Sequence, residues 1–201
     1  PMAIADLRRE YQAGGLDQQD LATDPLAQFQ DWFGHAAATQ SGSRWRKIGI
    51  ALFKLWQAIL GHAPADVNAM VLATATGAGQ PSARTVLLKG VDSRGFIFFT
   101  NYDSRKSQEI SQNPNVALVF YWPERQVCVA GPVTKLPVTE SAAYFQSRPR
   151  GSQLGAWASN QSMVVASRQV LDQKWQEVAA QFPQQVPLPP NWGGFVLSPT
   201  R

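Results

Sequence analysis

The chain has 201 residues, of which 44% are hydrophobic and 16% charged, and it carries a net charge of +4. This composition is typical of a globular protein and excludes intrinsic disorder, while the mild positive charge selects no particular class of partner. The single cysteine, Cys128, excludes an internal disulfide. His35 and His62 lie too far apart for a zinc motif, so we expect no metal.

The first residues, PMAIADLRREYQAGG, lack the apolar core and cleavage site of a secretory signal peptide. No apolar run approaches the length of a membrane span. We therefore expect a cytoplasmic protein. Its cations are dispersed among apolar strands and form no continuous stripe, so we expect no nucleic-acid partner.

The first element that the sequence predicts is a helix in DPLAQFQDWFGHAA, where Leu26, Phe29, Trp32 and Phe33 recur at helical spacing. An aspartate and a proline precede this apolar face, and they suit the cap and first turn of a helix.

A second helix is predicted in SRWRKIGIALFKLWQAIL. Basic residues lead into an apolar face formed by Ile48, Leu52, Trp56 and Ile59. A helix of this kind can lie on a membrane surface or bind a partner protein. Because the same stripe is typical of any helix that packs on its own domain, we favour packing over membrane contact.

Strands dominate the middle of the chain. Residues 68–100 predict three strands joined by turns at 76–79 and 92–95, the pattern of an antiparallel meander. A short helix in DSRKSQEISQNP and two strands around a turn at 122–124 follow. Two late helices, in TESAAYFQSRP and SRQVLDQKWQEVAAQFP, precede the beginning of a strand in WGGFVL. The sequence therefore predicts a mainly β, antiparallel α+β fold, a small barrel with peripheral helices, in one domain.

Three groups of polar residues are candidates for binding an anion. In FFTNYDSRKSQEI a strand runs directly into a helix, with Ser104, Arg105 and Lys106 at its start. The first N–H groups of a helix lack helical partners, and the helix dipole attracts phosphate there. From these residues alone, a capped helix start with both cations in solvent is the favoured interpretation.

The second group is Arg84 and Lys89 in ARTVLLKG. Residues five apart on a regular strand point to opposite faces, so either the strand is bulged or both faces line something polar. Cations inside so apolar a strand need a partner. That partner is either an anionic ligand or a neighbouring carboxylate.

The third group lies in YFQSRPRGS, where Tyr144 and Arg148 share a helical face and Pro149 ends the helix, so that Ser152 folds back from a loop. These donors would form a phosphate pocket, although taken alone a surface arginine and a half-buried tyrosine are favoured. The sequence carries no nucleophile elbow, phosphate loop or acid–base pair beside these groups. We therefore expect a cofactor to bring the chemistry.

Six stretches resemble the pyridoxine/pyridoxamine 5′-phosphate oxidase family, in family order: LRREYQAGGL, RTVLLKG, FFTNYDSRKSQEI, ERQVCV, YFQSRPRGSQLGAWASNQS and PLPPNWGGF. The resemblance implies an FMN-binding split β-barrel that forms a homodimer with the flavin at the subunit interface. It implies oxidation of pyridoxamine or pyridoxine 5′-phosphate to pyridoxal 5′-phosphate with O2, in vitamin B6 biosynthesis and salvage. The reaction would be a cofactor-driven hydride transfer without a catalytic side chain.

The resemblance also assigns roles to residues. Arg84, Arg105 and Lys106 would hold the FMN phosphate, with Asp103 as the helix cap. The whole flavin site, formed in part by the second subunit, would comprise Arg84, Thr85, Val86, Leu87, Leu88, Lys89, Phe99, Thr100, Ser104, Arg105, Lys106, Gln126, Gln161 and Ser162. The substrate would be bound by Arg8, Arg9, Glu10, Tyr11, Lys89, Tyr144, Arg148 and Ser152.

Three features depart from the family pattern. The segment at about 42–64 is longer than is usual there, and Phe99 stands where tyrosine is common. The C-terminus looks truncated, because family members continue with a strand pair that carries a flavin-contacting Trp, an Arg-x-His substrate motif and a further flavin-binding Arg. Two alternatives follow: a flavin- or pyridoxal-phosphate-binding relative without turnover, or an interaction module that uses the helix at 44–60.

Overall fold

A computed structural model of the chain describes residues 15–40, 66–122 and 125–200. The chain divides into two compact units, one formed by Pro1–Val67 with Tyr121–Val127 and the other by Asn68–Phe120 with Cys128–Arg201. The sequence-based expectations for residues 8–11, 42–64 and 44–60 lie outside the described residues. The expectation of a single domain over residues 1–201 stays a prediction.

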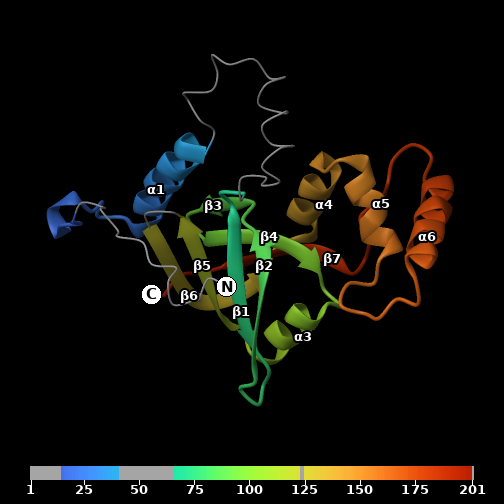
Figure 1. The fold of residues 1–201 in the computed structure, drawn as a ribbon, viewed down its shortest axis with the longest axis horizontal. Coiled ribbons are helices and arrows are strands. Elements are labelled where there is room, and N and C mark those ends of the chain that lie inside the picture. Colours follow the sequence, from blue (N-terminus) through green and yellow to red (C-terminus); the bar gives the residue numbers. More distant parts are fainter. Residues whose placement is uncertain (1–14, 41–65, 123–124, 201) are drawn as a thin grey trace, which may run out of the picture. The chain divides into compact units, whose positions relative to one another are not determined.

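Figure 1 shows the order of the described elements along the chain. They are η2 (Gln18–Asp20), α1 (Pro25–Gln40), β1 (Ala69–Ala75), β2 (Pro81–Leu87), β3 (Gly90–Asp92), β4 (Gly95–Asn101), α3 (Arg105–Gln112), β5 (Asn115–Trp122), β6 (Arg125–Lys135), α4 (Val138–Ser147), α5 (Arg150–Ala158), α6 (Arg168–Gln181) and β7 (Trp192–Leu197). The site described below lies wholly in the second unit.

Helix α1, in the first unit, begins where the sequence predicts. The Asp24 carboxylate accepts a hydrogen bond from the Leu26 amide at 2.9 Å, which satisfies one of the free N–H groups of the helix start. The rings of Phe29 and Phe33 lie 5.9 and 6.1 Å from the ring of Trp122, in the same unit. This aromatic contact explains why apolar residues recur at helical spacing in α1.

Seven strands form one sheet, in the order β2-β1-β5-β6-β7-β4-β3. Every strand pair whose register is described is antiparallel. Alternate residues of β1, β4 and β5 are buried, and Leu72, Phe98, Leu118 and Phe120 have no exposed surface. The prediction of a mainly β, antiparallel fold with peripheral helices is confirmed.

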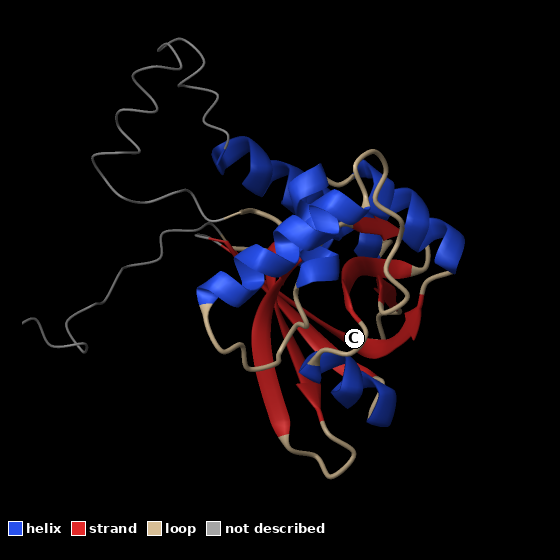
Figure 2. Ribbon diagram, turned by 90° about the vertical axis from the view of Figure 1, so that its right-hand side faces the viewer, coloured by secondary structure: helices blue, strands red, loops and turns tan. Residues whose placement is uncertain are grey.

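Two residues connect the outermost strands of this sheet. β2 and β3 stand at opposite ends of the strand order, yet only Leu88 and Lys89 separate them in the chain. The Leu88 amide donates to Asn68 O, next to β1, whereas the Lys89 amide donates to Ile97 O of β4, both at 2.8 Å. The sheet therefore curls until its edges approach each other, as the bent strands of Figure 2 show. The result is the expected split barrel.

The same connection corrects one detail of the sequence analysis. Three strands were predicted between residues 68 and 100, but the structure contains four. The chain changes its pairing partner at Leu88 and Lys89, and this change breaks the second predicted strand into β2 and β3. An uninterrupted run of β-forming residues carries no signal for such an exchange.

Strand β7, of which only the beginning was predicted, is a full strand that pairs with both β4 and β6. All six of its residues are buried. Gly194 lies opposite Phe99 of β4 in the register. A Cβ atom at Gly194 would lie 2.6 Å from Leu136 Cδ1 and 2.8 Å from Phe99 Cε1, so glycine is what lets Phe99 pack against β7.

Helices α4, α5 and α6 lie together on one side of the second unit (Figure 1). A buried cluster of Phe145, Leu154, Val186 and Trp192 joins α4 and α5 to β7, and Phe182, just after α6, packs against it. None of the helices within residues 15–40, 66–122 and 125–200 is both long and apolar enough to cross a bilayer.

Helix α5 was not predicted, because the glycines of RGSQLGAWA weaken the helical signal. α4 ends at Ser147, with Arg148 as an extended C-cap residue, so the expectation that Arg148 shares a helical face with Tyr144 is wrong. Pro149 is the N-cap residue of α5, a place where its missing N–H costs nothing. The Gln153 side-chain amide donates to Phe145 O at 2.9 Å and fixes α5 to α4. Ser152 therefore lies on a helix and not on the expected loop.

Gly95, at the turn between β3 and β4, should tolerate no side chain. Its φ is +129°, and an added Cβ would overlap the Leu197 carbonyl oxygen. We expect Gly95→Ala to lower the free energy of unfolding by about 3 kcal/mol or more, through strain and overpacking. Gly79→Ala is the matched control, since Gly79 has φ +84° but open space around it, and it should cost only about 1 kcal/mol. Equal losses in urea denaturation would contradict the overlap.

Candidate functional site

A pocket of about 960 Å³ opens in the second unit, between β2, β4, α3, α4, α5 and β7. Of the residues that the resemblance assigns to the flavin, its lining includes Arg84, Thr85, Val86, Leu87, Lys89, Phe99, Thr100, Arg105, Lys106, Gln161 and Ser162. Of the substrate residues, it includes Lys89, Tyr144, Arg148 and Ser152. Leu88 and Ser104 are buried and do not line it, and neither does Gln126 of β6. The assigned roles themselves stay predictions.

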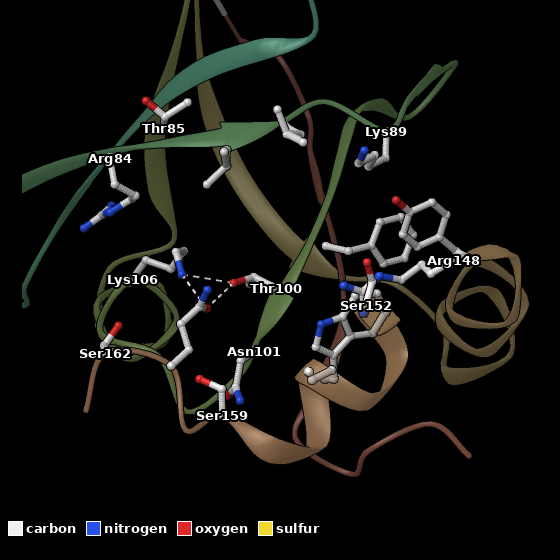
Figure 3. A pocket seen from close by; sticks show the side chains of 18 of the residues that line it. Arg84, Thr85, Lys89, Thr100, Asn101, Lys106, Arg148, Ser152, Ser159 and Ser162 are labelled. Atoms are coloured by element: carbon white, nitrogen blue, oxygen red, sulfur yellow. Dashed lines mark hydrogen bonds between the residues drawn. The ribbon is translucent and has the colours of Figure 1, made fainter. Parts of the chain in front are cut away.

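The pocket carries a cationic group at each end. Figure 3 shows Arg84 and Lys106 on one side, and Lys89 and Arg148 on the other. Arg84 and Lys89 line the same pocket because the chain changes strands between them, so the alternation of a single strand does not apply. Neither alternative from the sequence, a bulged strand or a single strand with two polar faces, applies, because β2 ends at Leu87 and β3 begins at Gly90.

The first end is built on a buried carboxylate. Glu109 of α3 is 3% exposed and accepts hydrogen bonds from Thr74 (2.5 Å), Ser82 (2.5 Å), Arg84 (3.1 Å) and Arg105 (2.9 Å). Burial by itself raises the pKa of this carboxyl, but the four donors outweigh it and hold the pKa of Glu109 at about 2. Glu109 is thus ionised at neutral pH, and it is the carboxylate partner of Arg84.

Arg84 is held rigidly in the sheet. It lies opposite Leu72 in the β1–β2 register, and its Nη1 donates to Leu72 O at 3.2 Å and to Thr74 Oγ1 at 2.5 Å. Its Nη2 donates to Ser82 Oγ and Glu109 Oε2. Four of the five guanidinium N–H groups are therefore used inside the protein, and Nε–H is left.

Lys106 is a buried ammonium group. The residue is 7% exposed, and Nζ donates to Thr100 Oγ1 at 3.0 Å, as Figure 3 shows. It also donates to Ser104 Oγ at 3.1 Å and Gln161 Oε1 at 2.8 Å. Burial, together with the charge of Arg84, lowers the pKa of Lys106 to about 8. All three partners are neutral, so no anion among the described residues compensates this charge directly.

The start of α3 differs from the expectation. Ser104 is the N-cap residue and Arg105 the first residue of the helix, so the expectation of Asp103 as the cap is wrong. The Asp103 carboxylate is used elsewhere, because it accepts a hydrogen bond from Asn191 Nδ2 at 2.7 Å. The Arg105 amide donates to Ser162 Oγ at 3.3 Å, so the loop after α5 lies over this helix end.

The second end combines stacked rings with an arginine. Phe99 stacks on Tyr144 at 3.9 Å and on Trp192 at 5.5 Å between ring centroids. The Arg148 guanidinium lies 4.7 Å from the centroid of the Trp192 ring. Burial lowers the pKa of Arg148, and its Nη1 is buried without a hydrogen-bond partner in the part of the chain that the structure describes. A buried N–H without an acceptor is costly, and an anionic ligand would supply that acceptor.

Sequence reasoning missed Glu109, Ser82 and Trp192. Two of them carried a local signal. Glu109 is four residues after Arg105 on a helix, the spacing of an ion pair, and Ser82 shares a strand face with Arg84. Trp192 stands before two glycines, and only the tertiary structure brings its ring onto Phe99.

Comparison with known proteins agrees with this geometry. A family model described as pyridoxamine 5′-phosphate oxidase matches residues 62–182. The chain belongs to the pyridoxamine 5′-phosphate oxidase family. Two similar relatives, both named pyridoxine/pyridoxamine 5′-phosphate oxidase, come from Paraburkholderia phymatum and Crocosphaera subtropica. The first is 48% identical over 98% of this chain and 82% of its own length, and the second 45% identical over 100% and 84%.

Solved structures support the same fold. PhzG from Burkholderia lata 383, in complex with tetrahydrophenazine-1-carboxylic acid, matches with a TM-score of 0.64 and 31% identity over 75% of each chain. A pyridoxamine 5′-phosphate oxidase-related, FMN binding protein from Nostoc punctiforme matches with a TM-score of 0.59 over 89% of this chain and 83% of its own. At 17% identity this second likeness shows the fold alone. It is consistent with the split barrel derived from the strand order.

The two pocket arginines should differ in how much stability the protein loses when their charge is removed. Arg84→Met leaves the buried Glu109 carboxylate without its sheet-bound partner, and we expect a loss of about 3 kcal/mol in the free energy of unfolding. Arg148→Met removes an unpaired buried donor, so the ligand-free protein should lose less than about 1 kcal/mol. Urea denaturation of the ligand-free variants measures both. A larger loss for Arg148→Met would contradict this account of the pocket.

Proposed function

We propose that the chain catalyses the FMN-dependent oxidation of pyridoxamine 5′-phosphate or pyridoxine 5′-phosphate to pyridoxal 5′-phosphate, with O2 as the electron acceptor. The observation that carries the proposal is one pocket with a cationic group at each end and stacked aromatic rings in its wall. The names of the relatives from Paraburkholderia phymatum and Crocosphaera subtropica support it.

The end that contains Arg84, Arg105 and Lys106 fits the phosphate of FMN. Their three positive charges and the negative charge of Glu109 sum to +2, the complement of a phosphomonoester dianion. Lys106 would contribute a point charge, and Arg105 the planar donor pair that suits phosphate oxygens. Bound there, FMN would supply the two-electron redox chemistry that side chains lack.

The opposite end fits the phosphate of the substrate. Lys89 and Arg148 would supply positive charge, with hydroxyl donors from Ser152 and Tyr144. The buried Nη1 of Arg148 has no acceptor among the described residues, and a phosphate oxygen would supply one. The residues of the chain would bind and orient both ligands, and orientation alone supplies about 7–11 kcal/mol of rate acceleration in favourable cases. No side chain has to act as a nucleophile.

We also propose a homodimer with the cofactor at the subunit interface. Val71 of β1 and Leu87 of β2 are 40% and 37% exposed, and Leu87 belongs to the lining of the pocket. Apolar side chains exposed beside a ligand pocket are typical of a surface that another chain covers. This feature supports the proposal, and equilibrium sedimentation tests it.

Absorption spectroscopy and oxygen uptake test the function directly. We expect the purified protein to be yellow, or to become yellow on reconstitution with FMN, and to consume O2 when pyridoxamine 5′-phosphate or pyridoxine 5′-phosphate is added. Flavin binding without O2 uptake would instead indicate a relative without turnover. Protein that binds no FMN would refute the proposal.

The affinity for FMN should depend on pH through Lys106. In the free protein the pKa of Lys106 is lowered to about 8, chiefly by burial, and a bound phosphate would raise it by stabilising the ammonium. Affinity should therefore be greatest below pH 8 and fall as the pH rises further, by up to about tenfold per unit. Quenching of flavin fluorescence at constant ionic strength measures it.

The matched control is Lys106→Met. It should bind FMN more weakly at pH 7 and show no decline between pH 8 and 9, because arginine guanidinium groups do not titrate there. A decline that persists in Lys106→Met would assign the pH dependence to another group.

A further inference from the structure

We propose that Glu109 is a positioning residue for two arginines: its carboxylate fixes Arg84 in the sheet and orients the Arg105 guanidinium toward the phosphate of FMN. This inference rests on the proposed function, because it concerns how the same pocket recognises its cofactor. Glu109 itself is not among the residues that line the pocket. It would act only through its neighbours.

The two oxygens of Glu109 serve different elements. Oε2 accepts from Thr74 of β1 at 2.5 Å and from Ser82 and Arg84 of β2 at 2.5 and 3.1 Å. Oε1 accepts from Arg105 Nε, one turn earlier on α3, at 2.9 Å. A single carboxylate thus ties the β1–β2 hairpin to the first turn of the helix. Because it is buried and all its bonds are satisfied inside the protein, its place does not depend on ligand.

The two arginines have very different numbers of free donors. Arg84 donates four of its five N–H groups to Leu72, Thr74, Ser82 and Glu109. It therefore acts on a phosphate mainly as a fixed positive charge, with Nε–H as its remaining donor. Arg84 therefore differs from the other cations that the resemblance groups with it, because little of its hydrogen-bonding capacity is left for a ligand.

Arg105 is used in the opposite way. Its Nε is committed to Glu109, while its Nη1 and Nη2 have no partner within the residues that the structure describes. These two nitrogens form the fork that binds two oxygens of one phosphate. The Arg105 side chain is 64% exposed, so without Glu109 it would sample many rotamers. Holding Nε fixes the plane of the guanidinium before the ligand arrives, which lowers the entropic cost of binding.

A substitution of Glu109 by glutamine separates positioning from simple electrostatics. Glu109→Gln removes one negative charge beside the anion site, so charge alone predicts tighter binding of FMN. Loss of positioning predicts weaker binding, because an amide oxygen accepts fewer hydrogen bonds than a carboxylate and the two arginines are no longer held together. The two explanations therefore predict effects of opposite sign.

The experiment compares FMN with riboflavin, which lacks the phosphate, by quenching of flavin fluorescence on the ligand-free full chain. For Glu109→Gln we expect affinity for FMN to fall by about tenfold or more and affinity for riboflavin to stay within about twofold of the wild type. A general defect in folding would lower both affinities. In an Arg105→Ala background the same substitution should cost clearly less, because its main target is already absent.

Glu177→Gln is the matched control for charge. Glu177 lies exposed on α6, so this change removes one negative charge without touching the pocket, and it should leave both affinities unchanged. If Glu109→Gln does not fold, Glu109→Asp replaces it in the same comparison of FMN with riboflavin. The shorter aspartate side chain keeps the negative charge but cannot reach both arginines. Glu109→Asp should show the same selective loss for FMN.

Unchanged or tighter binding of FMN by a folded Glu109 variant would overturn the inference, and so would an equal loss for FMN and riboflavin. The inference would also be overturned if Glu109→Gln lowered the affinity for FMN as much in the Arg105→Ala background as in the wild type. A failure of the proposed function gives a different result: without a flavin site the wild-type chain would bind no FMN, and without turnover it would bind FMN but consume no O2.

Discussion

Leu88 and Lys89 have to bridge the two outermost strands of a seven-stranded sheet, and the three Cα–Cα steps from Leu87 to Gly90 span at most about 11 Å. An open sheet of this size would hold its edges much farther apart, because neighbouring strands are spaced by about 4.8 Å. The short connection therefore forces the sheet to curl. Arg84 precedes the bridge and Phe99 lies on the partner of the strand that follows it, so both line one pocket. The pocket exists because the edges meet here.

Three cations of this pocket differ in the partners that the protein provides for their positive charge. Arg84 has a buried carboxylate partner, Lys106 has only neutral acceptors, and Arg148 has a buried N–H with no acceptor among the described residues. The last two arrangements cost free energy in the ligand-free chain. Such unfavourable arrangements are typical of ligand sites, where a bound ligand offsets their cost in free energy. Buried cations without a carboxylate partner therefore indicate that this pocket is a ligand site.

Local sequence signals predicted most of the elements, whereas the family resemblance supplied most of the pocket-lining residues that the sequence analysis named. Helical spacing and the Asp24 cap predicted α1, and alternation with glycine turns predicted the strands. The errors arose where tertiary structure overrides local preference. The division between β2 and β3 depends on a change of pairing partner, and α5 depends on packing against α4. Neither the change of pairing partner nor the packing of α5 on α4 can be predicted from local propensity.

In the candidate site, too, contacts between residues distant in the chain decide what local sequence cannot predict. Arg84 and Lys106 stand out in the sequence as cations among apolar residues, and the resemblance supplies a common ligand. Which cation has free donors depends on partners distant in the chain: Glu109 is 25 residues from Arg84, and Gln161 is 55 from Lys106. The sequence therefore predicts the composition of an anion site, whereas the hydrogen-bond partners decide which residues contact the ligand.

Burial lowers the pKa of Lys106, and the positive charge of Arg84 lowers it further. Two arginines share one carboxylate, so a third cation adds repulsion that nothing in the ligand-free pocket relieves. Deprotonation of Lys106 is one way to relieve it, and binding of a dianion is the other. A neutral flavin without a phosphate offers no such relief. If FMN binds here as proposed, this unrelieved repulsion would favour phosphorylated over unphosphorylated flavin, because only the phosphate offsets it.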